Sequence, residues 1–350
     1  MKKILAITSG KKTPSSRFRI RQHIHGLNRC GFIISESCPP IEKNRSVPFL
    51  SRLNPRYYLP LYFLWVLIKA LQRLPLLMVS RKYDYIWLNR ELVTGYYTLE
   101  GLLGKKVVLD VDDAIWKNPP FGHYAAKRIA KESYAVICGN EYLANWFRKY
   151  NDRVYIIPTA VDTERFHPVS RDTKASSIMI GWIGTHGNLK YIEEIFPSIL
   201  SLLNEYKSLK LNIVCDKQPS FIGMHSSVTF TKWSEEDEIQ NFQSIDIGLM
   251  PLPDNEWTKG KCSFKLLQHL SCGSLVVGSP VGMNKSVLLG AANGAYSAKT
   301  KNEWYFVLKE LIDDFDEIYP MQKEKARDFI IDNYSAVKIQ SELKKVFSNG

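Results

Sequence analysis

The sequence predicts an α/β protein made of two β/α halves. Three observations support this prediction. The chain has 350 residues, enough for about two domains; short apolar runs alternate with amphipathic stretches of helix length; and one polar, proline-containing segment interrupts the alternation. Apolar runs separated by helices are typical of parallel strands buried on both faces of a sheet. We therefore expect two Rossmann-like domains whose parallel sheets face each other across a cleft.

The first half of the chain carries six predicted strands. The first ends at Ser9-Gly10, and a predicted helix over residues 19–29 separates it from the second. Each strand is a short apolar run bounded by polar residues or glycine. The runs are residues 3–7, 32–34, 85–88, 107–109, 135–138 and 154–157. We assign residues 1–168 to an N-terminal domain.

A predicted linker and a second β/α series follow. Residues 169–177 are polar and lack apolar periodicity, which is typical of a linker. The predicted C-terminal domain covers residues 178–325, with strands at 178–181, 211–215, 228–230, 246–250 and 275–277 and helices at 189–206, 235–243 and 264–272. Apolar residues recur through the last segment, residues 326–350, so we expect it to be helical and to pack back on the first domain.

Composition limits the class of protein and of partner. Hydrophobic residues make up 45% and charged residues 23%, an ordinary globular composition that excludes disordered, collagen-like and disulfide-rich classes. The net charge of +12 favours an anionic partner: nucleic acid, an acidic membrane surface or a phosphorylated ligand. The six cysteines show no C-x-x-C pair and no metal-ligand spacing, so we expect a reduced, cytosolic protein without a targeting segment.

One segment is unusually apolar. In residues 57–79 the longest uncharged apolar stretch is residues 61–68, shorter than the ~20 residues that a spanning helix needs. The sequence therefore predicts that this segment does not cross a bilayer. Neighbouring arginines and lysines would suit docking on anionic lipid. The alternative is a buried helix before the strand at 85–88. At least half of the segment must be such a buried helix.

Lysines lie at the predicted start of the helix over residues 264–272. A helix N-terminus offers unpaired N–H groups and a partial positive charge, which together bind phosphate. Lys261 and Lys265 are four residues apart, and the sequence predicts that they share one helix face. The alternative is a solvated basic turn.

The run from Gly260 to Gly273, with Val276-Val277 and Pro280-Val281-Gly282, resembles the donor motif of GT-B glycosyltransferases of family 4. Three further segments resemble the same family in the same order: residues 109–114, residues 156–162 with Phe166, and residues 181–187. The resemblance implies a retaining transferase that uses a nucleotide-diphospho-sugar, with the donor bound mainly by the second domain.

The resemblance also implies which residues contact the donor. Two positions that are acidic in the family read Gly260 and Gln268 here; the glycine offers only backbone, whereas the amide can bond ribose hydroxyls. Lys261 and Lys265 would stabilise the leaving diphosphate, and no protein nucleophile is needed. The implied donor-binding residues are Gly184, Thr185, His186, Gly260, Lys261, Cys262, Ser263, Phe264, Lys265 and Gln268.

Asp110-Val111-Asp112-Asp113 admits two interpretations. Read alone, D-x-D is a site for Mg²⁺ or Mn²⁺ against a diphosphate. The resemblance instead places Asp112 near the reacting sugar, where it would orient donor or acceptor as a catalytic residue beside Lys261 and Lys265. We therefore expect no metal ion and no other cofactor. Asp113 could cap a helical turn at residues 114–116.

The acceptor side is predicted from one cluster and from the resemblance. Ser16, Arg17 and Arg19 would suit a diphosphate or an acidic glycan; the alternative is surface arginines that lead a helix. Family relatives imply a glycan or lipid-linked glycan as acceptor, in surface-polysaccharide synthesis at the cytoplasmic face of the cell membrane, with no nucleic-acid partner. Two rival functions remain: a nucleotide-sugar epimerase on the same fold, and a non-enzymatic basic binding protein.

Overall fold

The computed structural model describes residues 1–50, 57–104, 106–169, 177–291 and 294–348. The chain divides into two compact units. Unit 1 combines Met1–Ala160 with Gly260–Cys262 and Ile339–Gly350, and unit 2 combines Val161–Lys259 with Ser263–Lys338. This division falls before the expected boundary at residue 168 and splits the expected C-terminal segment. Residues 170–176 of the predicted linker lie outside the described residues.

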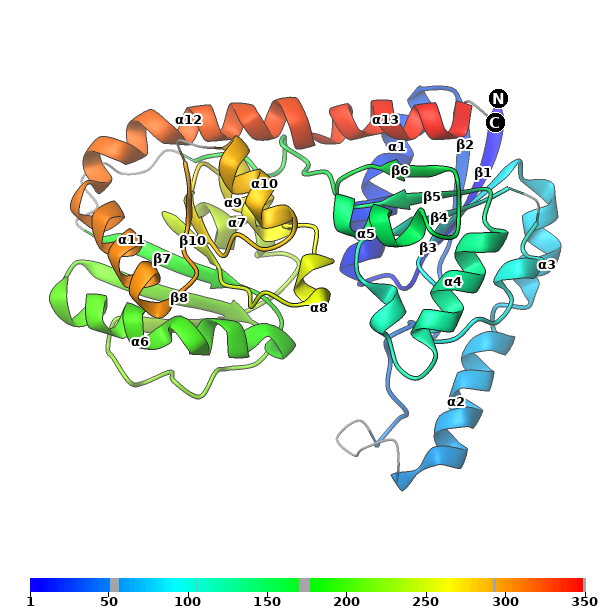
Figure 1. Cartoon of the computed structure of the whole chain (residues 1–350), viewed down its shortest axis with the longest axis horizontal. Coiled ribbons are helices and arrows are strands. Elements are labelled where there is room, and N and C mark those ends of the chain that lie inside the picture. Colours follow the sequence, from blue (N-terminus) through cyan, green and yellow to red (C-terminus); the bar gives the residue numbers. More distant parts are fainter. Residues whose placement is uncertain (51–56, 105, 170–176, 292–293, 349–350) are drawn as a thin grey trace. The chain divides into compact units, whose positions relative to one another are not determined.

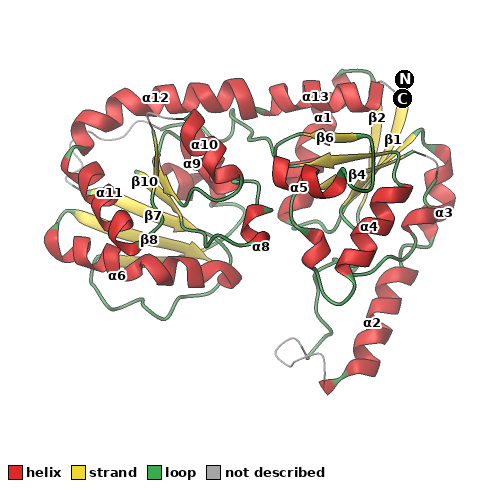
Figure 2. Cartoon of the chain, in the orientation of Figure 1, coloured by secondary structure: helices red, strands yellow, loops and turns green. Residues whose placement is uncertain are grey.

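Unit 1 is built on a parallel sheet of six strands in the order β2-β1-β3-β4-β5-β6 (Figures 1 and 2). All residues of β3, β4 and β5 are buried, which explains why these segments read as continuous apolar runs. The six predicted strands are all present, as Lys2–Ile7 (β1), Phe32–Ser37 (β2), Tyr85–Asn89 (β3), Val107–Val111 (β4), Ala135–Cys138 (β5) and Val154–Ile156 (β6).

The helices of unit 1 surround this sheet. The segment predicted as one helix begins as a π-helix, η1, and continues as α1. Near the chain end, the ring of Phe347 in α13 packs against Tyr85 and Trp87, with centroids 5.6 Å and 5.3 Å away, so the last helix covers part of the sheet. The helices are η1 (Ser16–Arg21), α1 (Gln22–Arg29), α2 (Leu59–Leu71), α3 (Pro75–Val79), η3 (Ser80–Lys82), η4 (Glu100–Leu102), η5 (Ile115–Lys117), α4 (Gly122–Glu132), α5 (Glu141–Phe147) and α13 (Ala336–Ser348), of which residues from Ile339 onward belong to unit 1.

Unit 2 holds a second parallel sheet of six strands, in the order β12-β11-β10-β7-β8-β9. Five of its strands match the predicted runs, and β12, only three residues long, was not predicted. The two parallel sheets confirm the α/β prediction. The strands are Ile178–Ile183 (β7), Leu209–Cys215 (β8), Val228–Lys232 (β9), Ile247–Met250 (β10), Leu275–Gly278 (β11) and Ala295–Ser297 (β12).

The helices of unit 2 cover its sheet. One hydrophobic core joins α6 and α11 to the strands through residues such as Ile199, Leu202, Trp304 and Leu308. Because all strands of a parallel sheet end at the same edge, the loops that follow them converge there. The helices are η6 (His186–Asn188), α6 (Leu189–Glu205), α7 (Glu238–Gln243), α8 (Glu256–Lys259), α9 (Phe264–Ser271), α10 (Met283–Gly290), α11 (Lys301–Asp313) and α12 (Phe315–Tyr334).

Candidate functional site

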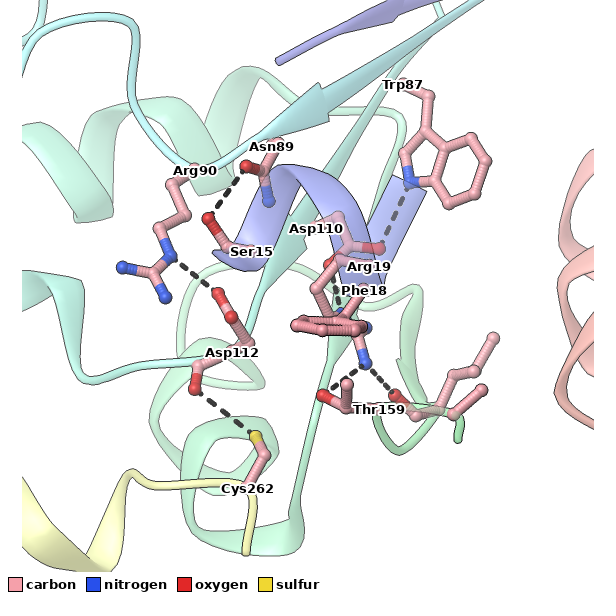
Figure 3. Close-up of polar contacts among 12 residues, drawn as sticks. Ser15, Phe18, Arg19, Trp87, Asn89, Arg90, Asp110, Asp112, Thr159 and Cys262 are labelled. Atoms are coloured by element: carbon pink, nitrogen blue, oxygen red, sulfur yellow. Dashed lines mark hydrogen bonds and ion pairs between the residues drawn. The ribbon is translucent and has the colours of Figure 1, made fainter. Parts of the chain in front are cut away.

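A buried ion pair lies at the carboxyl end of the unit 1 sheet. The Arg19 Nε atom donates to Asp110 Oδ1 at 2.7 Å, and Trp87 Nε1 donates to Asp110 Oδ2 at 3.0 Å (Figure 3). Arg19 Nη1 donates to the carbonyl of Ile157 at 2.7 Å, which ties η1 to the end of β6 as well. Burial raises the pKa of Asp110, and the Arg19 charge opposes that shift. These contacts join four segments of unit 1: η1, β3, β4 and the end of β6.

Ser16, Arg17 and Arg19 are the residues predicted to bind the acceptor. All three lie in η1 and are buried, with exposed fractions of 0%, 8% and 3%. Ser16 Oγ accepts a hydrogen bond from the backbone N–H of Ser9 at 3.0 Å. The hydroxyl of Ser16 and the guanidinium of Arg19 therefore serve the interior of unit 1.

Arg90 binds both carboxylates that follow β4. Its Nε donates to Asp112 Oδ1 at 2.5 Å, and its Nη2 donates to Asp113 Oδ2 at 2.7 Å. Burial acts to raise the pKa of Asp112, but the adjacent Arg90 charge holds that pKa below its usual value. Asp112 is thus a fixed, ionised carboxylate (Figure 3).

The neighbouring carboxylate does not act as expected. Asp113 does not cap the turn after it: the N-cap of η5 is Ala114, without a side-chain cap. Among the described residues, no group of three or more His, Cys, Asp and Glu side chains is arranged for a metal ion.

Asn140 fixes the segment Gly260–Cys262, which the sequence placed in the donor motif. Its Nδ2 donates to the carbonyls of Gly260 and Lys261 at 3.2 Å and 3.0 Å, while its Oδ1 accepts from Leu143 N at 2.9 Å and caps α5. In a trans peptide the N–H points opposite to the carbonyl, so the N–H groups of Lys261 and Cys262 point away from Asn140. Sequence reasoning missed Asn140, although Gly-Asn between a strand and a helix is an N-cap signal.

The thiol of Cys262 completes this attachment. Burial raises the pKa of the thiol well above its ordinary value, so the group is protonated and donates to the carbonyl of Asp112 at 3.2 Å (Figure 3). A Cβ at Gly139 would lie 2.2 Å from the Cys262 sulfur, and only glycine leaves room for it. The candidate residue Cys262 therefore positions a backbone segment.

Lys261 and Lys265 do not share a helix face, so that prediction is wrong. The helix α9 begins at Phe264, after the N-cap Ser263, and Lys261 precedes it. Lys265 Nζ donates to Gln268 Oε1 at 3.0 Å and lies 4.9 Å from the ring centroid of Phe242. Gln268 is fully buried, and its amide nitrogen has no hydrogen-bond partner among the described residues. A buried amide donor without a partner calls for an explanation, and a bound ligand would supply one.

A buried polar chain fixes the start of α9. Ser263 Oγ donates to Asn284 Oδ1 at 2.7 Å, and Asn284 Nδ2 donates to the carbonyl of Ser279 at 3.0 Å. Ser279 Oγ in turn accepts from Leu252 N at 3.0 Å. Ser263 has a φ of 51°, in the left-handed region that costs a non-glycine residue about 1 kcal/mol. The loops after β10 and β11 therefore hold a strained helix start in place.

His186 in the loop after β7 is held by Asp216, which directly follows β8. The backbone N–H of His186 donates to Asp216 Oδ1 at 2.7 Å, and its ring Nδ1–H donates to Asp216 Oδ2 at 2.5 Å. Burial acts to raise the pKa of Asp216, but these two hydrogen bonds hold that pKa below its usual value. Gly184 is required beneath this loop, since a Cβ there would lie 2.4 Å from the ring of Trp182. Sequence reasoning selected Gly184, Thr185 and His186 but missed the carboxylate.

No family model and no curated protein sequence matches the chain. Solved structures do match it over its full length. Sucrose-phosphate synthase from Thermosynechococcus elongatus aligns with a TM-score of 0.72 at 13% identity, covering 100% of this chain and 99% of that one. The chain has the GT-B fold.

Two further structures of this fold were solved with ligands. Anabaena HepE in complex with UDP and glucose aligns with a TM-score of 0.72 at 12% identity, covering 100% of both chains. The catalytic domain of starch synthase IV from Arabidopsis thaliana, bound to ADP and acarbose, aligns with a TM-score of 0.71 at 10% identity, covering 99% of both chains. At these identities the shared property is the fold.

Proposed function

We propose that this chain is a retaining glycosyltransferase of family 4. It transfers a sugar from a nucleotide-diphospho-sugar to a hydroxyl of a glycan or lipid-linked glycan in cell-surface polysaccharide synthesis. The observation that carries the proposal is the full-length match to GT-B structures solved with UDP, with UDP-glucose or with ADP. Three of the sequence motifs that resemble the family cover the carboxyl ends of β4, β6 and β7 with the loops that follow, and the fourth includes α9. In such folds ligands bind at the carboxyl ends of strands.

The donor site in this proposal includes the start of α9. Gln268 has a buried amide nitrogen that none of the described residues engages, which suits a ribose hydroxyl. Lys265, bonded to the same amide through Oε1, supplies a positive charge for the diphosphate. Asn140 holds the segment before α9 by donating to the carbonyls of Gly260 and Lys261.

The proposed chemistry needs no protein nucleophile. The acceptor hydroxyl oxygen bonds to the anomeric carbon on the face that the diphosphate leaves, the bond from that carbon to the diphosphate oxygen breaks, and the hydroxyl proton passes to the leaving diphosphate. Lys261 and Lys265 stabilise the negative charge that develops on the diphosphate. Asp112 remains ionised beside Arg90 and orients an acceptor or donor hydroxyl by accepting its hydrogen bond. In this scheme no metal ion is required, and the enzyme works at the cytoplasmic face of the cell membrane.

Nucleotide binding gives the first test. We expect one of UDP, GDP, ADP or CMP to raise the melting temperature of the full chain selectively, with or without EDTA. A ligand that binds only the folded state stabilises it by about 2.7 kcal/mol at a hundredfold excess over Kd. Incubation with the matching nucleotide-sugar and a lipid-linked glycan should then give a product with the anomeric configuration of the donor, read by NMR. Absence of any shift contradicts the proposal, and conversion to a second nucleotide-sugar without acceptor would instead assign an epimerase.

A further inference from the structure

In unit 1, the helix α2 exposes large apolar side chains to solvent. In α2 and the turn after it, large apolar side chains remain exposed by 36–52%, and in Figure 1 α2 extends from the body of unit 1. The helical segment Leu59–Lys82 is long and apolar enough, by length and composition alone, to cross a membrane. Length and composition alone therefore do not decide the sequence prediction that this segment does not cross a bilayer. The exposed side chains are Leu59, Leu61, Phe63, Leu64, Leu67, Ile68, Leu71 and Leu74.

The polar side chains of this segment fasten one end of it to unit 1. Lys69 Nζ donates to the carbonyl of Lys43 at 2.7 Å, and Arg73 Nη2 donates to the carbonyl of Thr8 at 3.0 Å. Gln72 exchanges two hydrogen bonds with the backbone of Ile41, at 2.9 Å and 3.1 Å. The opposite end of α2, residues 59–68, contains no charged side chain. These hydrogen bonds therefore hold the C-terminal end of the helix, and its N-terminal part carries no charge.

The charge pattern around α2 complements an anionic lipid surface. From Lys43 to Tyr83 the sequence contains eight Lys and Arg residues and no Asp or Glu. Arg45, Arg81 and Lys82 are exposed. Apolar side chains with flanking cations and no anion suit the boundary between acyl chains and anionic headgroups.

The sheet topology decides how the segment can meet a bilayer. Both β2, which precedes it, and β3, which follows it, pair with β1. A single crossing would place two strands of one sheet on opposite sides of the membrane, so α2 must enter and leave from the same side. Its 13 residues span about 20 Å, less than the ~30 Å hydrocarbon core.

We infer that α2 inserts into one leaflet of an anionic bilayer and anchors unit 1 there, without crossing. The inference goes beyond the proposed function, because lipid binding through α2 requires neither nucleotide nor acceptor. If both hold, the enzyme works at the surface where a lipid-linked acceptor resides.

Vesicle co-sedimentation tests the anchor. The full chain should sediment with vesicles of phosphatidylcholine and phosphatidylglycerol, and Leu61→Ser/Leu64→Ser should lower its partition coefficient by at least about tenfold, because two half-exposed leucines no longer enter the acyl region. Phe306→Ser is the matched control: Phe306 is 64% exposed on α11, and its loss should leave sedimentation unchanged. Melting curves of all variants verify that they are folded.

Fluorescence measures the depth. Trp65 is half-buried and donates through Nε1 to the carbonyl of Arg45 at 3.0 Å, so the probe is placed on the exposed face, at Phe63, in a Trp65→Phe background. In Phe63→Trp/Trp65→Phe the new indole should be quenched by lipids brominated on their acyl chains, and Trp65→Phe alone should lack that quenching. Absence of vesicle binding, or equal binding by the double variant, overturns the inference. Association of the chain with itself in lipid-free buffer, abolished by the double variant, overturns it in favour of a second copy covering α2. A protein that binds vesicles but no nucleotide supports the anchor and rejects only the proposed function.

Discussion

The Arg19 guanidinium and the Asp110 carboxylate meet at 2.7 Å inside unit 1, with only 2% and 1% of their side chains exposed. The pair joins a π-helical turn near the chain start to the end of a central strand 91 residues later. Removing water from two charges costs several kcal/mol each, which their attraction and added hydrogen bonds must offset. The main contribution of each side chain to stability is therefore to neutralise the buried charge of the other.

Arg19→Met is expected to lower the free energy of unfolding by about 3–5 kcal/mol, because it leaves Asp110 buried and uncompensated. Arg21→Met is the control, since Arg21 pairs with Glu36 at the surface with 34% of its side chain exposed and should cost under about 1 kcal/mol. Urea unfolding of both variants measures the difference. Equal losses of unfolding free energy in the two variants would show that the buried pair stabilises the fold no more than the surface pair does.

Asn140 should affect donor binding and stability separately. Asn140→Ser keeps an N-cap oxygen for α5 but removes the amide that binds the carbonyls of Gly260 and Lys261. We expect it to weaken nucleotide-sugar affinity by about tenfold, the loss of about 1.4 kcal/mol of positioning. Asn140→Ala should weaken affinity equally and also lose about 1 kcal/mol of stability with the cap. Calorimetric titration and thermal melting separate the two effects, and unchanged affinity in both variants would contradict the positioning role.

Lys265→Met is expected to weaken nucleoside diphosphate binding by at least about tenfold while the affinity for the nucleoside alone stays the same, because a charge-assisted hydrogen bond contributes about 1.5–3 kcal/mol. Lys259→Met is the control: Lys259 pairs with Asp254 at 2.9 Å, and its side chain is 41% exposed. Titration calorimetry with the diphosphate and the nucleoside gives both numbers. A loss of nucleoside affinity equal to that of the diphosphate would show damage to the fold of the site instead.

The buried imidazole of His269 is expected to make the stability of the fold depend on pH. It is fully buried in α9, and burial lowers its pKa from 6.5 to about 3, with the Lys265 charge adding to the shift. The unfolded chain therefore binds a proton below pH 6.5 that the folded chain rejects, so stability falls as the pH drops from 6.5 toward 3. At pH 5 the expected loss is about 2 kcal/mol from this residue alone.

His269→Leu should remove that dependence, since leucine has a similar volume and no titrating group. Relative to the original chain, the variant should gain stability progressively as the pH is lowered from 7 to 5, measured by urea unfolding at each pH. A constant difference across that range would mean that His269 does not titrate as its burial implies. His23, whose pKa burial also lowers to about 3, adds a second loss of the same sign in both proteins.

The sequence predicted the strands well because a parallel strand buried on both faces is a continuous apolar run, as in β3 and β4. It missed β12, which has three residues and follows a helix closely. The partners of the arginine cluster near the chain start could not be predicted, because Arg17, Arg19 and Arg21 lie on a π-helix, where two of them are buried and the third binds Glu36.

The loops that follow the strands could be selected as candidate sites because topology alone brings strand ends together. Which side chains of these loops bind one another could not be predicted. Arg90, directly after β3, binds Asp112, directly after β4, and Asn140 binds Lys261 across 121 residues of sequence. Contacts of that kind depend on how segments pack, which no local pattern records.

The division of the chain has a consequence for its synthesis. Unit 1 includes Gly260–Cys262 and the residues from Ile339 onward, so a ribosome completes it only after all of unit 2 has been translated. Until then Trp87 and Tyr85 lack the ring of Phe347 that covers them. The six strands of unit 1 are complete once Ile156 has been made, so a nascent chain must keep the part of this sheet that α13 covers from aggregating while the remaining residues are translated.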